Sequence, residues 1–127
     1  MNTDSIKIIF VGDILIHSSY NKIASNGDTS FVFQKISHAL SDAEIRFGNL
    51  ESVLSKKGSP IDGKGCLLGD EKYIRSLKDV DFNILSLANN HTFDFGLEAF
   101  EDMAINLQKA GIRTVGAGFN LEESRKI

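Results

Sequence analysis

The chain has 127 residues, 42% of them hydrophobic, and a formal net charge of −3 at neutral pH. This length predicts one domain, and the weak acidity with scattered basic residues argues against a nucleic-acid partner. No stretch approaches the ~20 apolar residues of a membrane span, and the polar residues 1–5 lack the pattern of a signal peptide, so the compartment stays undetermined.

The first half of the chain predicts two strands, a helix and a loop. A nearly continuous apolar run predicts a buried strand over 6–11, and a short strand is expected at 45–47. The glycine-rich segment 56–69, which holds the only proline, is predicted to be a surface loop. A helix is predicted for 30–43, with an apolar face of Phe33, Ile36, Ala39 and Leu40.

The second half alternates strands and helices. Strands are expected at 82–88 and 112–115. Between them, residues 96–110 have the clearest helical pattern, with a stripe of Leu97, Phe100, Ala104 and Leu107. Two further helices are predicted from their N-terminal residues, Asp70 for one, which reaches about residue 78, and Asn120 with Glu123 for the other.

Strands that alternate with helices predict an α/β fold with a mostly parallel sheet. Parallel strands end at one edge of a sheet, and in open α/β sheets this edge is where sites form. Five polar residues lie just past the predicted strand ends: Asp13, Asn49, Glu51, Asn90 and His91. Their convergence favours a functional site over chance placement.

The segment 86–96, Ser-Leu-Ala-Asn-Asn-His-Thr-Phe-Asp-Phe-Gly, is the most informative part of the chain. An amide beside the imidazole of His91, with Asp94 three residues later, offers metal ligation, acid–base chemistry and an orienting group. The alternative is an Asx-rich turn that Gly96 closes.

The side chains at the predicted edge suit a divalent metal. Asp13 and Glu51 are hard oxygen donors, Asn90 is a neutral one, and His91 adds a nitrogen. This mixture favours Mg²⁺, Mn²⁺, Zn²⁺ or iron, and such an ion would neutralise a phosphoryl group and activate water. Each residue also has a structural alternative, such as a tight turn at Asp13 or a solvated Glu51.

Three other residues are weaker candidates. His17 follows Asp13 by four residues, and it could bind substrate or metal or be an ordinary loop histidine. Asn49 is a candidate of the same kind. His38 lies opposite the apolar face of its predicted helix and is expected to be exposed.

Four segments occur in an informative order: Val-Gly-Asp-Ile-Leu-Ile-His at 11–17, Gly-Asn-Leu-Glu at 48–51, the segment 85–96, and Gly-Ala-Gly-Phe-Asn at 116–120. Together they resemble the CapA family of bacterial capsule and poly-γ-glutamate biosynthesis proteins, also called PgsA-like. The string Ala-Asn-Asn-His-x-x-Asp-x-Gly is its most specific part. The resemblance runs from about residue 6 to the end.

This family is similar to the calcineurin-like metallophosphoesterases, so the resemblance implies the N-terminal part of an αββα sandwich and metal-dependent phosphoester hydrolysis. It implies that Asp13 is the first metal-binding aspartate and that Glu51 takes the place of the bridging acid. Asn90 and His91 match a metal ligand followed by the catalytic histidine, and Asp94 an orienting residue. The implied partner is an anionic surface polymer or a phosphorylated substrate.

The chain departs from the family pattern at both ends. The family usually has an N-terminal anchor or leader, and its domain continues into a second half that supplies further histidines of the metal site. We therefore expect residues 1–127 to be a single CapA-like domain truncated at its C-terminal end. A homodimer or the missing half would cover the exposed sheet. A non-catalytic metal- or polymer-binding component of an export assembly, or an inactive truncation, is the alternative function.

Overall fold

The computed structural model describes residues 5–24 and 26–126; the polar N-terminal residues 1–4 and Ile127 lie outside this description. The elements follow in the order β1 (Ile8–Ile14), the 3-10 helices η1 (Ser18–Lys22) and η2 (Ser30–Val32), α1 (Ser37–Ser41), β2 (Ile45–Leu50), β3 (Val53–Leu54), β4 (Leu68–Gly69), the 3-10 helix η3 (Glu71–Tyr73), α2 (Ile74–Asp79), β5 (Ile84–Ser86), α3 (Gly96–Lys109), β6 (Arg113–Val115) and α4 (Leu121–Ser124). Within the described part of the chain, no helix combines the length and apolar character needed to cross a bilayer.

Four parallel strands in the order β1-β2-β5-β6 form the main sheet, and β3 pairs with β4 in a second, two-stranded parallel sheet. The predicted α/β fold with a mostly parallel sheet is confirmed. It is consistent with the metallophosphoesterase-like fold that the resemblance implies. Because all four strands of the main sheet run the same way, their carboxyl ends meet at one edge.

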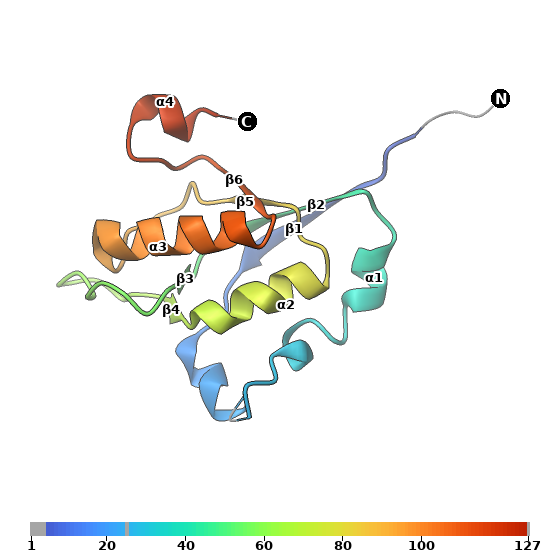
Figure 1. Cartoon of the computed structure of the whole chain (residues 1–127), viewed down its shortest axis with the longest axis horizontal. Coiled ribbons are helices and arrows are strands. Elements are labelled where there is room, and N and C mark those ends of the chain that lie inside the picture. The colour runs from blue at the N-terminus through green and yellow to red at the C-terminus, as the bar shows by residue number, and fades with distance from the viewer. Residues whose placement is uncertain (1–4, 25, 127) are drawn as a thin grey trace.

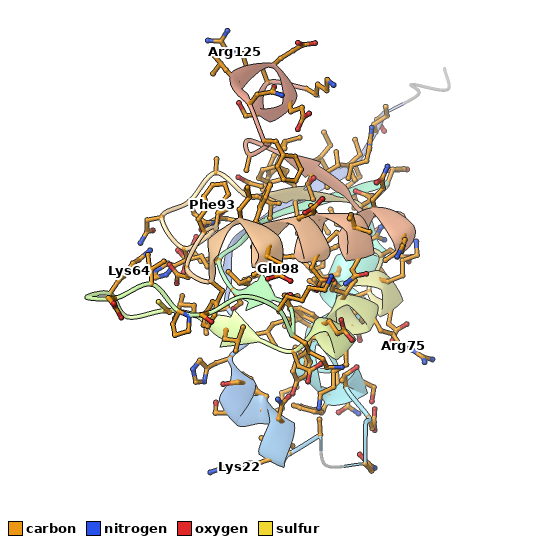
Figure 2. All side chains as sticks on the ribbon, turned by 60° about the vertical axis from the view of Figure 1, so that its left-hand side comes forward. Lys22, Lys64, Arg75, Phe93, Glu98 and Arg125 are labelled. Carbon is orange, nitrogen blue, oxygen red and sulfur yellow. The ribbon has the colours of Figure 1, made fainter. Side chains whose placement is uncertain are left out.

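The two faces of the main sheet differ in cover. Along β2, every second residue (Arg46, Gly48 and Leu50) is buried, while the residues between them are half-buried. Helices α2 and α3 lie on one side of the sheet and the short α4 lies on the other (Figures 1 and 2). The core on the helix-covered side includes Leu50, Leu77, Leu85, Phe100, Met103 and Leu107.

The prediction for the first strand was wrong in bounds and in burial. Strand β1 extends past residue 11 to Ile14, and Ile6, Ile8 and Phe10 are 69%, 45% and 71% exposed. Strand β1 is one of the two edge strands of the main sheet, and these side chains lie on the face that α2 and α3 leave open. An apolar run alone does not reveal which face of a strand other elements will cover.

The predicted helix over 30–43 is replaced by η2 and the short α1. Between them the backbone makes i−3 turns, from Gln34 to Phe31 and from Ile36 to Phe33. This break lets Phe33 pack against Phe82, with ring centroids 5.7 Å apart, while Ile36 stays 46% exposed. Packing of a large aromatic ring has overridden the helical pattern.

Three further predictions need correction. The predicted loop 56–69 ends in β4, and the strand expected at 82–88 is limited to Ile84–Ser86. Helix α3 buries a stripe rotated from the predicted one: Leu97 is 57% exposed, and the buried residues are Ala99, Phe100, Met103 and Leu107. The rotation brings the sulfur of Met103 within 3.3 Å of the backbone N–H of Leu54 in β3.

The predicted helix starts are confirmed. The Asp70 carboxylate accepts a hydrogen bond from the backbone N–H of Lys72 at 3.0 Å, at the start of η3 and α2. The Asn120 side chain accepts one from the backbone N–H of Glu123 at 2.9 Å, at the start of α4. His38 is exposed, as expected.

Asp102 of α3 fastens the segment after β3 to this helix. The hydroxyl of Ser55 donates to Asp102 at 2.6 Å, and Nζ of Lys57 lies 3.3 Å from the same carboxylate. The hydrogen bond from Ser55 lowers the pKa of Asp102 below its usual range, with Lys57 helping to outweigh the opposing effect of burial.

We expect the Asp102→Asn variant to lose less free energy of unfolding on acidification than the original protein. A folded-state pKa below the unfolded value of about 3.9 stabilises the fold above that pH, and this stability is lost as the pH falls through the folded-state pKa. Urea unfolding at about pH 7 and about pH 3 gives the loss of free energy of unfolding on acidification for the original protein and for the variant. Equal losses in the two proteins would contradict the prediction.

Candidate functional site

Asp13 reaches the edge of the sheet through a β-bulge in β1. Phe10 pairs with Phe47, and the next pair is Asp13 with Asn49, so β1 holds one extra residue between these pairs. Because successive side chains of a strand alternate between faces, the extra residue turns Asp13 to the same face as Asn49. Without the bulge, its carboxylate would lie on the face that packs against the helices.

Gly48 lies opposite the bulge and leaves room for it. A Cβ atom at Gly48 would lie 2.6 Å from Cδ1 of Ile14 and 2.8 Å from Cγ2 of Val11, closer than real Cβ atoms approach their neighbours. Any other residue would therefore require the side chains of Ile14 and Val11 to shift. This is a physical reason for glycine in the segment 48–51.

A row of hydrogen bonds crosses three neighbouring strand ends. Nδ2 of Asn49 donates to Oδ1 of Asp13 at 2.8 Å, and Nδ2 of Asn89 donates to Oδ1 of Asn49 at 3.1 Å. Asn49 also pairs with Ser86 at the end of β5, three residues before Asn89. The structure therefore brings Asp13 and Asn49 together and joins them to the loop after β5.

Asn89 connects this row to the histidine loop, although the sequence reasoning singled out Asn90 instead. Its Nδ2 also donates to the carbonyl oxygen of Leu50 at 2.9 Å. Its Oδ1 accepts from the backbone N–H of His91 at 3.0 Å and from the hydroxyl of Thr92 at 3.2 Å. The bond to the residue two positions later is an Asx turn, so the structural alternative for this segment is present at Asn89. The tendency of asparagine to form an Asx turn was the one signal in the sequence that could have identified Asn89.

His91 and Asp94 lie together in the same loop. Nδ1 of His91 is 2.7 Å from Oδ2 of Asp94, which is fully buried. The backbone N–H of Leu67 donates to the same oxygen at 2.8 Å, and Nζ of Lys64 lies 2.5 Å from Oδ1. Burial acts to raise the pKa of Asp94, but the hydrogen bonds from Lys64, His91 and Leu67 outweigh it and leave this pKa below its usual range. With Nδ1 engaged, Nε2 is the ring nitrogen of His91 that remains for a ligand.

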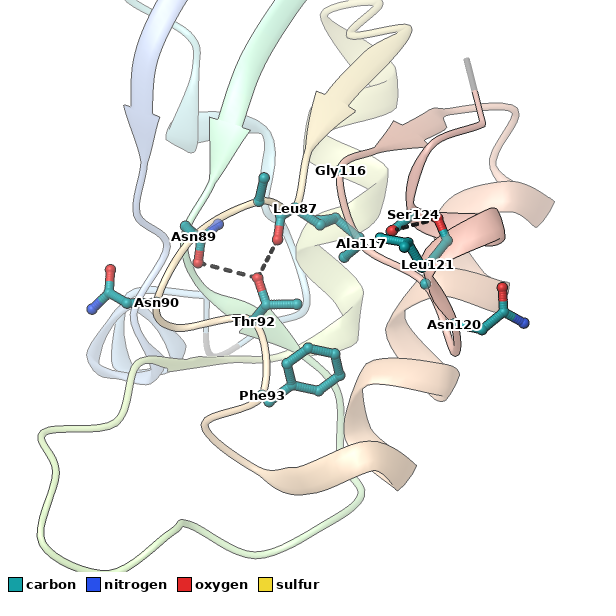
Figure 3. A pocket seen from close by; sticks show the side chains of 12 residues that line it. Leu87, Asn89, Asn90, Thr92, Phe93, Gly116, Ala117, Asn120, Leu121 and Ser124 are labelled. Atoms are coloured by element: carbon teal, nitrogen blue, oxygen red, sulfur yellow. Dashed lines mark hydrogen bonds between the residues drawn. The ribbon is translucent and has the colours of Figure 1, made fainter.

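Glu51 and Asn90 lie near the same edge with their polar side chains unengaged by the described residues. Glu51 directly follows β2, and its backbone N–H donates to the carbonyl oxygen of Ile14 at 3.1 Å. Asn90 is exposed, and its side chain turns away from the 116–124 segment (Figure 3). Neither the carboxylate of Glu51 nor the side-chain amide of Asn90 forms a hydrogen bond among the residues that the structure describes.

His17 has a local structural role in this structure. It is the N-cap of η1, and its Nδ1 lies 3.1 Å from both the backbone nitrogen and the hydroxyl of Ser19. No hydrogen bond in the described part of the chain connects the imidazole of His17 to Asp13. Its predicted part in binding substrate or metal stays a prediction.

The described residues do not form a complete metal site. Across residues 5–24 and 26–126, no three His, Cys, Asp or Glu side chains are grouped closely enough to hold a metal ion. The donor types still suit a divalent cation, since Asp13 has Oδ2 free of Asn49 and His91 has Nε2 free of Asp94. This part of the chain thus offers individual donors at one edge without a closed ligand set.

A cavity of about 610 Å³ adjoins the edge, between the loop after β5 and the turn after β6 (Figure 3). Gly116 allows the close approach, because its φ is +86° and a Cβ there would lie 2.6 Å from Cβ of Ala88. The cavity is lined by Leu87, Ala88, Asn89, Asn90, Thr92, Phe93, Gly116, Ala117, Gly118, Asn120, Leu121 and Ser124. None of these side chains ionises, so the cavity suits an uncharged polar part of a ligand.

The sequence that forms this edge lies within a region similar to known proteins. The sequence matches the family model described as "Bacterial capsule synthesis protein PGA_cap" over residues 7–127. The chain belongs to the PGA_cap family. The resemblance to CapA proteins is confirmed by this match and by curated relatives of that name.

Two CapA relatives cover almost the whole chain. The PGA biosynthesis protein CapA of Bacillus subtilis (strain 168) is 27% identical over 125 residues, which are 97% of this chain and 33% of that protein. The Capsule biosynthesis protein CapA of Bacillus anthracis is 27% identical over 128 residues, 98% of this chain and 31% of that protein. This PGA_cap chain therefore spans about a third of the length of these relatives.

A third relative is similar over a shorter region. The Probable polyglutamine synthesis accessory protein of Mycobacterium tuberculosis (strain ATCC 25618 / H37Rv) is 34% identical over 79 residues, 61% of this chain and 21% of that protein. The three names refer to the biosynthesis of PGA, of a capsule and of polyglutamine.

Proposed function

We propose that this PGA_cap chain contributes to a metal-dependent phosphoesterase that acts in the synthesis of a capsule polymer. The observation that carries the proposal is the row of hydrogen bonds from Asp13 through Asn49 to Asn89, which continues to His91. It supports a common site because groups far apart in sequence are held in fixed relative positions at the carboxyl ends of parallel strands, where such sheets bind ligands.

In this proposal Asp13, Glu51, Asn90 and His91 supply ligands to one or more divalent ions, Mn²⁺, Mg²⁺, Zn²⁺ or iron. A metal ion bound there would neutralise phosphoryl charge and lower the pKa of bound water. Because the described residues lack a closed ligand set, the proposal requires further ligands. The relatives are about three times as long as this chain, so in them such ligands have room to lie elsewhere in the protein.

The side chains of the protein would then have separate roles in catalysis and in substrate binding. His91, oriented by Asp94, would use Nε2 in one of two ways: the neutral ring would bind a metal ion through the lone pair of Nε2, or the doubly protonated ring would donate the Nε2 proton to the leaving oxygen. The substrate would be an anionic polymer or a phosphorylated compound, and the names of the relatives refer to PGA and capsule biosynthesis. An uncharged part of such a substrate would fit the cavity beside Asn90.

A second candidate function is metal or polymer binding without turnover, as a component of a synthesis or export assembly. The incomplete grouping of donors among the described residues favours it, because binding an anionic polymer through a loosely held cation requires fewer ligands than catalysis does.

One assay separates the two candidates. The protein is incubated with Mn²⁺ and bis(p-nitrophenyl) phosphate, with a parallel sample in EDTA. Release of p-nitrophenol that saturates with substrate and disappears with EDTA supports the phosphoesterase. Saturable Mn²⁺ binding by calorimetry without release supports the binding component. Absence of both results would contradict both candidates for this chain on its own and would favour an inactive site in it.

A further inference from the structure

Lys64 lies in the segment 56–69, which the sequence alone predicted to be a surface loop. Its side chain is only 29% exposed. Its ammonium group contacts two acceptors of the histidine loop, Oδ1 of Asp94 and the backbone carbonyl oxygen of Asn90. Lys64 and the loop containing Phe93 lie on the same side of the molecule (Figure 2).

The contact is part of a larger connection between two loops. The backbone N–H of Leu67 donates to Oδ2 of Asp94, and the backbone N–H of Ile61 donates to the backbone carbonyl oxygen of Asp94 at 2.9 Å. With the thiol of Cys66, which donates to the same carbonyl oxygen at 3.5 Å, Asp94 receives bonds from four residues of the earlier loop and from one residue of its own, His91. The position of the carboxylate is therefore set by residues about thirty positions earlier in the chain.

This geometry decides how the imidazole is held. A fully buried carboxylate needs a cationic or hydrogen-bonding partner, and Lys64 provides the cation. A carboxylate held in this way only accepts hydrogen bonds, so Nδ1 of a neutral His91 must carry the proton and Nε2 must present its lone pair.

We infer that Lys64 is a positioning residue, which acts through Asp94 to hold His91 in the tautomer and orientation that expose Nε2. The inference rests on the proposed function only for its catalytic consequence. Lys64 does not need to touch the substrate, because both contacts of its ammonium group that the structure describes are within the protein.

The test uses the metal-free protein and does not depend on activity. Long-range ¹H–¹⁵N spectra at one fixed pH report which ring nitrogen of each histidine carries the proton, and His91→Gln identifies the His91 signals. We expect one tautomer, protonated at Nδ1, in the original protein and in Lys64→Arg. We expect Lys64→Met and Lys64→Gln to lose this preference and show both tautomers, while Lys56→Met, an exposed lysine paired with Glu71, keeps it.

A single Nδ1-protonated tautomer in folded Lys64→Met and Lys64→Gln would overturn the inference. If one of the two variants failed to fold, the other together with Lys64→Arg would still decide it. Where phosphodiesterase activity is present, Lys64→Met should lower kcat and leave KM unchanged. A raised KM with unchanged kcat would place Lys64 on the substrate and also overturn the inference.

Discussion

Replacing His91 with glutamine is expected to lower metal-dependent hydrolysis of bis(p-nitrophenyl) phosphate by about 10²- to 10⁴-fold, the usual contribution of a general acid or base. Glutamine keeps a polar side chain, but it has no ring nitrogen that can hold and release a proton at neutral pH. Asp13→Asn should cause a loss of similar size, since it removes the carboxylate charge that a divalent ion requires. Initial rates at saturating Mn²⁺ measure both effects.

The other two histidines provide matched controls. His38 is exposed on α1, so His38→Gln should leave the rate unchanged. His17→Gln tests the open question of its role: an unchanged rate would fit its local N-cap contact with Ser19, while a loss as large as that of His91→Gln would place it in the site. Retention of full activity and metal binding by His91→Gln would show that the assignment of the site is wrong.

Replacing Asn89 with alanine is expected to lower the free energy of unfolding by about 2–3 kcal/mol, because it leaves a backbone carbonyl and a backbone N–H without partners. These groups belong to Leu50 at the end of β2 and to His91 in the loop. The same change would release Asn49, which holds Asp13. Urea unfolding followed by circular dichroism gives the free energy.

Asn90→Ala is the matched control, since it removes the same side chain from the next position. The side chain of Asn90 is exposed and forms no hydrogen bond among the described residues, so its loss should change the free energy of unfolding by less than about 0.5 kcal/mol. Under the proposed function it should instead weaken Mn²⁺ binding, which calorimetry measures. Equal destabilisation by the two substitutions would contradict the distinct roles of these neighbours.

Most elements could be predicted because their patterns are local. The alternation of strands and helices and the starts at Asp70 and Asn120 depend on residues a few positions apart. The failures came where distant packing decided the outcome. Phe33 breaks its predicted helix to pack on Phe82, and the open face of the sheet leaves Phe10 exposed on an apolar strand.

In the candidate site, too, local patterns predicted some features and distant contacts decided the others. The sequence placed Asp13, Asn49 and His91 at strand ends, and a parallel sheet brings such ends to one edge. It did not reveal the bulge that turns Asp13 toward Asn49, since the bulge is defined by pairing with a strand more than thirty residues away. The sequence analysis also missed Lys64, because this residue lies in a glycine-rich segment without periodicity. Its role follows only from its contact with Asp94 in the structure.

By itself, the sequence determined the fold class, the family and which types of donor are available, because these follow from local periodicity and from short motifs of fixed spacing. Only the tertiary structure decided which of two adjacent asparagines holds the strand ends together and which distant cation holds Asp94 in place. The physical reason is that hydrogen bonds and burial depend on distances in space, which the order of residues along the chain does not specify.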